Sequence, residues 1–288
     1  MTSSFGDETT NILLERKVKY VILMLYFKKR TEMKRVLNHS AVMSEILGFF
    51  FFNTITVMDI LQGGWAMKYL NSYERALLQI QQELIAMGQL VTTRLDEALQ
   101  AFLTQDVSLA RVLMDGDDVI DAYKETIEYQ ALEWLSLQQP LDKDLRFLMA
   151  AIRIGQELER IGDYACDIAD SVVCQELPRQ WQDGVEELAG QVSSLLHRSL
   201  TAHFNKDLGS ARCRNEEDDQ VDRLFAKLLR QLLNGMKECP ERIEQANALV
   251  MVVRYLERIG DRAVNISKMT IYAETGERDP FKSQKAVL

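Results

Sequence analysis

Apolar residues recur at intervals of three and four along most of the chain after residue 72, a spacing that lines one face of an α-helix. Prolines and short polar runs interrupt this pattern, and a proline ends or begins a helix because it lacks a backbone N–H. The pattern predicts six helices, at residues 73–103, 106–138, 142–174, 181–205, 208–237 and 241–274. Helices near 30 residues suit a bundle. We therefore expect an all-α protein.

The second group of three helices repeats the first. The acidic run Asp117–Asp121 corresponds to Asp218–Asp222, and the six residues Leu158–Asp163 are identical to Leu256–Asp261. Order and spacing agree along both halves, and a repeat near 100 residues indicates duplication of a whole three-helix unit. The sequence therefore predicts two tandem three-helix bundles.

Residues 1–66 do not share the repeat. Their most apolar stretch, Ile46–Leu61, has 16 residues with polar interruptions, whereas a membrane-spanning helix needs about 20 mostly apolar residues. We expect the native start at Met67, because the codons of residues 62–64 could hold a bacterial ribosome-binding sequence; a loosely folded extension and a membrane anchor are the alternatives. The expected organisation is an extension at 1–66, repeats at 67–177 and 178–275, and a tail at 276–288.

Charge and cysteine usage narrow the classes of function. The net charge is −9 and the pI is near 5.1, so direct nucleic-acid binding is not expected, because it needs a basic patch. The four cysteines form no CxxC pair, which favours reduced thiols in a cytosolic protein over a zinc ribbon or disulfides. No P-loop, GxSxG, HExxH or dinucleotide fingerprint occurs.

The repeated motifs carry pairs of carboxylates four residues apart, which lie on one face of a helix. If the helices on either side of Pro140 are antiparallel neighbours, the pairs converge, and so do their counterparts in the second half. Convergent carboxylates repel one another unless a cation lies between them, and oxygen ligands favour Mg, Ca, Mn, Fe or Zn. The candidate metal ligands are Asp117, Asp121, Glu159 and Asp163 in the first half, and Asp218, Asp222, Glu257 and Asp261 in the second.

The helical wheel places these acids away from the apolar stripe Leu158, Ile161, Ala165 and Ile168, so we expect them to face solvent or a shallow groove. The alternative is an acidic surface neutralised by nearby arginines. A buried di-iron site of the ferritin kind is not expected, because no Glu-x-x-His occurs.

Two further features bear on these motifs. Gly155 and Gly162 lie on one helix face, which indicates close helix packing or approach to a metal, since helix glycines are otherwise unfavourable. Asp167 in the first half becomes Asn265 in the second, which predicts a weaker or smaller second metal cluster.

The paired motifs LERIGDYACDIAD and YLERIGDRAVNIS, with the run Leu84–Gly88, resemble those of PhoU proteins, and the resemblance extends from about Met67 to Tyr272. It implies two three-helix bundles, with iron or zinc clusters on the eight carboxylates named above. It also implies a cytoplasmic negative regulator of phosphate uptake and of the phosphate-starvation response. The implied partners are the ATPase subunit of a phosphate ABC transporter and a sensor histidine kinase; a homodimer remains open.

Two other functions are alternatives. An accessory protein of another phosphate transporter would share the helical units. A carboxylate-bridged metalloenzyme, such as a phosphatase or oxidase, would need an open coordination position and a placed base or nucleophile. The three histidines lie outside every acidic motif, so we expect binding without catalysis.

Overall fold

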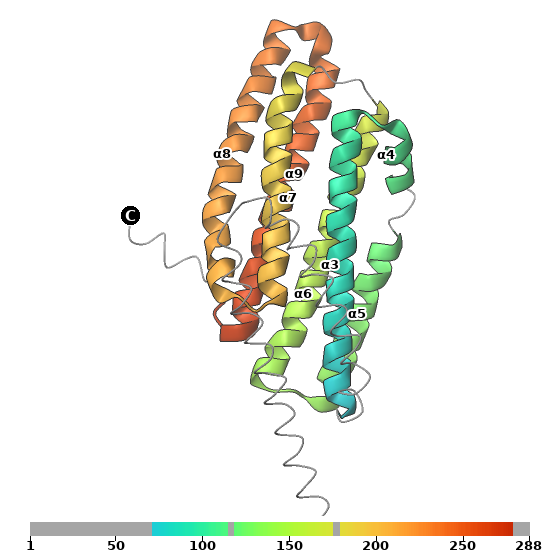
Figure 1. Ribbon diagram of the computed structural model, residues 1–288, viewed down its shortest axis with the longest axis vertical. Coiled ribbons are helices and arrows are strands. Elements are labelled where there is room, and N and C mark those ends of the chain that lie inside the picture. Colours follow the sequence, from blue (N-terminus) through green and yellow to red (C-terminus); the bar gives the residue numbers. More distant parts are fainter. Residues whose placement is uncertain (1–70, 115–117, 175–178, 279–288) are drawn as a thin grey trace, which may run out of the picture. The chain divides into compact units, whose positions relative to one another are not determined.

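A computed structural model describes residues 71–114, 118–174 and 179–278, without the side chains of residues 173, 174, 179–183 and 215. The described residues form helices and connecting turns, without a strand. The helices, shown in Figure 1, are α3 (Ser72–Thr104), α4 (Val107–Met114), α5 (Asp118–Gln138), α6 (Asp142–Cys174), α7 (Arg179–Phe204), α8 (Leu208–Glu238) and α9 (Ile243–Thr275), with a short 3-10 helix, η1 (Pro240–Arg242), before α9. The prediction of an all-α fold is confirmed.

Several predictions fall outside these residues. The extension 1–66, the boundary at 177/178, most of the tail 276–288 and the candidate ligand Asp117 are not described. The range predicted as a single helix at 106–138 holds two described helices, α4 and α5, on either side of residues 115–117. In the second half, α8 runs without interruption from Leu208 to Glu238.

Local sequence explains several helix ends. Asn71 and Glu74 form a capping box at the start of α3, in which each side chain accepts a hydrogen bond from the other residue's backbone N–H. Asp207 caps α8 by accepting from the backbone N–H of Ser210. Gly276, at φ 81°, ends α9 in the left-handed conformation that glycine adopts readily. These caps fix where the long helices begin and end.

The first half (α3–α6) and the second half (α7–α9) lie side by side, with α6 packed on α9 and α3 on α7 (Figure 1). Contacts between α6 and α9 run in opposite directions along the two helices: Arg146 reaches Ala273, Arg153 reaches Met269, Glu157 reaches Arg262 and Tyr164 stacks on Tyr255. The two helices are therefore antiparallel, and an approximate two-fold axis passes near their midpoints and relates the halves.

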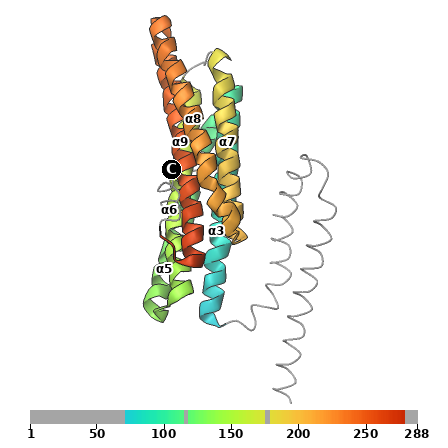
Figure 2. The ribbon, with the colours of Figure 1, turned by 90° about the vertical axis from the view of Figure 1, so that its left-hand side faces the viewer.

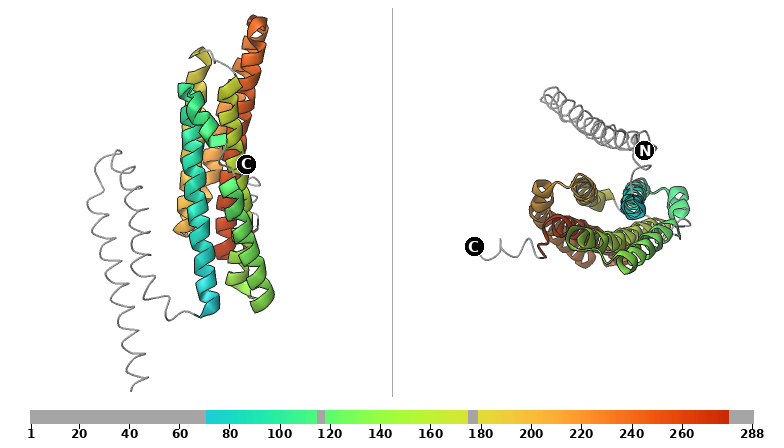
Figure 3. Two further views of the ribbon diagram at one scale, coloured as in Figure 1. Left: turned by 90° about the vertical axis from the view of Figure 1, so that its right-hand side faces the viewer. Right: turned by 90° about the horizontal axis from the view of Figure 1, so that it is seen from below.

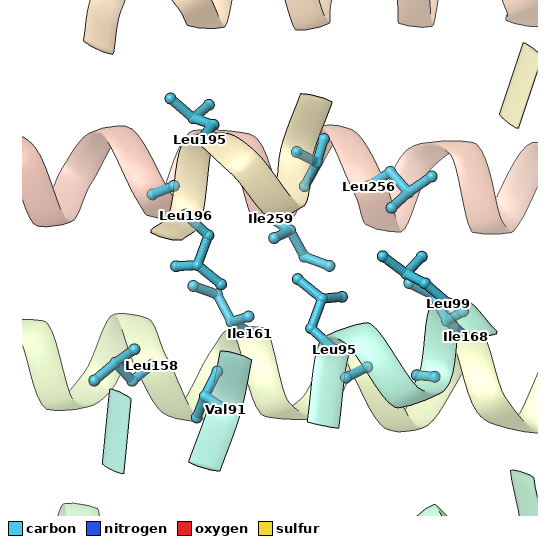
Figure 4. Packing of buried hydrophobic residues seen from close by; sticks show 14 of the residues in the cluster. Val91, Leu95, Leu99, Leu158, Ile161, Ile168, Leu195, Leu196, Leu256 and Ile259 are labelled. Carbon is cyan, nitrogen blue, oxygen red and sulfur yellow. The ribbon is translucent and has the colours of Figure 1, made fainter. Parts of the chain in front are cut away.

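The two bundles share one hydrophobic core. Figure 4 shows apolar side chains of α3, α6, α7 and α9 pointing into the space between these helices. Leu158, Ile161 and Ile168 are fully buried and Ala165 nearly so, which confirms the predicted stripe. Figures 2 and 3 show the outer helices: α5 packs along α3 and α6, and α8 packs along α7 and α9. Each acidic motif therefore lies where an outer helix meets a central one.

None of the described helices is both long and apolar enough to cross a lipid bilayer.

Candidate metal centre

The first acidic cluster, where α5 meets α6, contains its own cations. Asp121 lies in the first turn of α5, and Glu159 and Asp163 lie on α6. Arg160 donates from Nη1 to Asp163 Oδ2 at 3.1 Å, and its Nε lies 3.5 Å from Glu159 Oε2. Lys124 Nζ lies 3.8 Å from Glu159 Oε1. Two side chains of the protein therefore offset much of the negative charge in this cluster.

The carboxylates of the first cluster are nevertheless close enough to repel. The pKa of Glu159 is raised, first by burial and then by Asp163, with Asp121 contributing less. Arg160 and Lys124 oppose this rise. The convergence of the acidic pairs from α5 and α6 is therefore confirmed for the described members.

The second acidic cluster lies where α8 meets α9 and contains Asp218, Asp222, Glu257 and Asp261. The pKa of Asp218 is raised to about 7, first by burial and then by Asp222 and Asp261, while Lys268 opposes this rise. The pKa of Glu257 is also raised, first by burial and then by Asp261 and Asp222. These acids therefore lie close enough to interact electrostatically, and the charged form of Asp218 is costly near neutral pH.

None of the seven described candidate ligands is buried; Asp121, Asp222 and Asp261 are exposed and the others are intermediate. The prediction that the acids face solvent or a shallow groove is therefore confirmed for these seven. Three of them lie on the outer helices α5 and α8, and the other four lie on α6 and α9, which pack against those helices.

Glycines allow the helices to approach beside these clusters. A Cβ on Gly162 would lie 2.8 Å from Cδ1 of Ile120, so α5 packs directly on that position of α6, as predicted. At the equivalent Gly260, a Cβ would lie 3.3 Å from Val221 and 3.6 Å from Oδ1 of Asp218. The missing side chain keeps space open next to Asp218. For Gly155 the close-packing prediction is wrong, because a Cβ there would meet no described atom within 4 Å.

Asp167 and its counterpart Asn265 both make hydrogen bonds between the two halves, at the contact of α6 with α9. Tyr255 donates a hydrogen bond to Asp167, and Asn265 Nδ2 donates to Glu157 Oε1 at 3.2 Å. Arg262 Nη1 donates to Glu157 Oε2 at 3.1 Å. Sequence reasoning missed this polar contact of α6 with α9; the signal available was the mismatch of Glu157 with Tyr255 in the aligned repeats. The predicted weakness of the second metal cluster stays a prediction.

The donor set fits a cation in charge and in chemistry. All donors are carboxylate oxygens, they repel one another, and Gly260 leaves room beside Asp218. Among the described residues, however, no three Asp, Glu, His or Cys side chains stand at the spacing of a formed metal site. The eight-residue ligand set therefore stays a prediction. Cys166, Cys213 and Cys239 form no disulfide.

Comparisons with known proteins agree with the internal repeat. The family model described as the PhoU domain matches the chain twice, at residues 84–172 and 185–270. A curated relative from Clostridium acetobutylicum, named a phosphate-specific transport system accessory protein PhoU homolog, is 33% identical over 210 residues, 72% of this chain and 95% of the relative. A homolog of the same name from Xylella fastidiosa is 32% identical over 209 residues, 72% of this chain and 87% of its own.

Solved structures agree in fold. The crystal structure of PhoU from Pseudomonas aeruginosa superposes with a TM-score of 0.69 at 30% identity, covering 72% of this chain and all of that one. The phosphate transport system regulatory protein PhoU from Streptococcus pneumoniae gives a TM-score of 0.66 at 26% identity, covering 72% and 98%. With two family domains, the same helical fold and two related acidic motifs, this chain belongs to the PhoU family.

Proposed function

We propose that this protein is a negative regulator of phosphate uptake and of the phosphate-starvation response, and that it acts by binding cations and partner proteins. The phosphate-transport part is supported by relatives that share both domains and are named accessory proteins of phosphate-specific transport. The observation that carries the binding part is the pair of acidic clusters, each formed by an outer and a central helix.

The eight candidate ligands would hold the cations, with Asp117, Asp121, Glu159 and Asp163 in the first cluster and Asp218, Asp222, Glu257 and Asp261 in the second. Iron or zinc is implied by the family resemblance, and Mg, Mn or Ca would suit the oxygen donors equally. A bound cation would supply positive charge, which would offset the burial and the carboxylate repulsion that together raise the pKa of Asp218. Because each ligand set spans two helices, occupancy fixes the spacing of α5 to α6 and of α8 to α9.

The proposed partners are the ATPase subunit of the phosphate ABC transporter and a sensor histidine kinase, with the protein in the cytoplasm. An acidic surface favours association with basic protein surfaces, and cation binding changes that surface at two places. We propose no turnover. His203 on α7 bonds through Nδ1 to Thr270 Oγ1 at 3.0 Å and lies on a different helix from the seven described candidate ligands.

Alkaline-phosphatase output in phosphate-replete cells lacking this gene tests the regulatory role. High output that the full-length chain suppresses is the expected result. The second-cluster variant Asp218→Asn/Glu257→Gln should bind less metal in elemental analysis of the dialysed protein and suppress less. The matched control Glu186→Gln/Glu187→Gln, at two exposed acids on α7, should behave as wild type.

Unchanged phosphatase output after deletion of the gene would contradict the regulatory proposal and favour an accessory role in another transporter. Full suppression by the second-cluster variant, despite loss of metal, would contradict the link between cation binding and regulation.

A further inference from the structure

A charged groove lies where α5, α6 and α9 meet. It has a volume of about 440 Å³ and is open to solvent. Its lining includes the cations Lys124, Arg160 and Arg262 and the carboxylates Glu157, Glu159 and Glu128. Three separate helices thus bring cationic side chains to one hollow directly beside the first acidic cluster.

The lining of the groove is only partly repeated in the second half. In the second half Phe225 takes the place of Lys124, Leu229 that of Glu128, and Tyr164 that of Arg262. There Tyr164 stacks on Tyr255 at 5.8 Å, and Arg258, the equivalent of Arg160, lies over the Tyr164 ring. Arg254 and Glu257 stand at the positions of Gln156 and Glu159, so charged side chains remain there, but four of the seven lining positions are aromatic or apolar in the second half.

The cations of the groove are paired with the acids that the proposed function assigns to a metal. Lys124 and Arg160 contact Glu159, and Arg160 also contacts Asp163. Arg262 is paired separately with Glu157. A cation bound to Glu159 and Asp163 would compete with Lys124 and Arg160 for these carboxylates and would leave both side chains available to an added anion. Guanidinium and ammonium groups are the side chains that bind phosphoryl oxygens best.

We propose that the α5–α6–α9 groove binds a free phosphoryl oxyanion between Lys124 and Arg160, and that a cation in the first acidic cluster strengthens this binding. Gln156 supplies a neutral amide donor in the wall of the groove. Because coupling between two binding sites is reciprocal, the anion also strengthens cation binding. This inference rests on the metal binding proposed above and adds a second ligand and its regulation.

The test is binding of inorganic phosphate to the full-length protein by isothermal titration calorimetry, with and without saturating Mn²⁺. We expect phosphate binding at least about tenfold tighter with Mn²⁺. The variant Arg160→Gln should weaken phosphate binding about tenfold, the typical effect of losing one charge-assisted hydrogen bond. Arg258→Gln, the same change at the equivalent position of the second half, should leave phosphate affinity unchanged, and both should keep the helical circular-dichroism spectrum.

The outcomes separate this inference from the proposed function. Failure of Mn²⁺, Fe²⁺ and Zn²⁺ to bind at all would overturn the metal proposal itself. Metal binding without phosphate binding, or equal losses in both arginine variants, would overturn only the groove. Phosphate binding that ignores Mn²⁺ would overturn the coupling. Phosphoserine serves as a second probe: its binding in place of inorganic phosphate would point to a phosphorylated protein and contradict a free oxyanion.

Discussion

The two acidic clusters differ in how their negative charge is offset. In the first half Lys124 and Arg160 reach the carboxylates directly. In the second half Phe225 stands in place of Lys124. The pKa of Asp218 is raised to about 7 although Lys268 opposes this, and Arg258 and Arg254 oppose the smaller rise in the pKa of Glu257. The two halves therefore place corresponding carboxylates in different electrostatic surroundings, because the residues around them differ. Conserved spacing within a repeat does not by itself make two sites equivalent.

The largest expected effect tests whether the halves are one folding unit. Ile161 and its counterpart Ile259 are both fully buried near the two-fold axis. Truncation of either to alanine should cost about 2–5 kcal/mol, as for other buried aliphatic side chains. Because the core is shared, urea unfolding followed by circular dichroism should remain a single transition with a similar loss in both variants.

The control for this prediction is Leu141→Ala, because Leu141 is 79% exposed and its truncation should change stability by less than about 0.5 kcal/mol. Two separate unfolding transitions in Ile161→Ala would show that the first half unfolds alone, which contradicts a shared core.

A smaller effect is expected from His203, which occupies the position of Phe102 in the first half. Burial, aided by Lys206, lowers the pKa of His203 to about 4, while Glu274 opposes this. Below pH 6.5 the unfolded chain takes up a proton that the folded chain does not, so stability falls from pH 6.5 towards pH 4. Between pH 6.5 and pH 4 the variant His203→Phe should lose about 2 kcal/mol less unfolding free energy than the wild type. Urea unfolding at both pH values measures this difference.

Phe102→Leu provides the matched change in the first half. It should shift stability equally at both pH values, since no titrating group is removed. A wild-type acid lability that persists in His203→Phe would contradict the role of His203.

The smallest expected effect is a difference in stability between substitutions in the two acidic clusters. The raised pKa of Asp218 means that its contribution to stability is present below pH 3.8 and is lost as pH rises through about 7. Metal-free Asp218→Asn should therefore be more stable than wild type at pH 8, by about 1 kcal/mol after allowance for solvent screening, and equal at pH 4.

In the first cluster, Asp163→Asn removes one of the two carboxylates that Arg160 contacts. The variant should lose between zero and about 1 kcal/mol of unfolding free energy at pH 8. Opposite signs for the two substitutions in urea unfolding are the expected result. The same sign for both would show that the clusters are electrostatically alike.

Much of the fold was predictable from the pattern of residues. Helix periodicity, the caps at Asn71 and Asp207, and the prolines at the joints act through neighbouring residues, so they can be read from the chain. Apolar periodicity alone did not indicate that the described residues of the range 106–138 form two helices, α4 and α5.

The sequence by itself determined the helices, the duplication and the carboxylate pairs, because each depends on spacings of a few residues or on direct identity between repeats. Only the tertiary structure decided how the halves meet. The antiparallel packing of α6 on α9 brings Arg262 to Glu157 across 105 positions of the chain and joins Arg262 with Lys124 and Arg160 around one groove. Such contacts depend on the register between distant helices, which the shared core sets and no local pattern records.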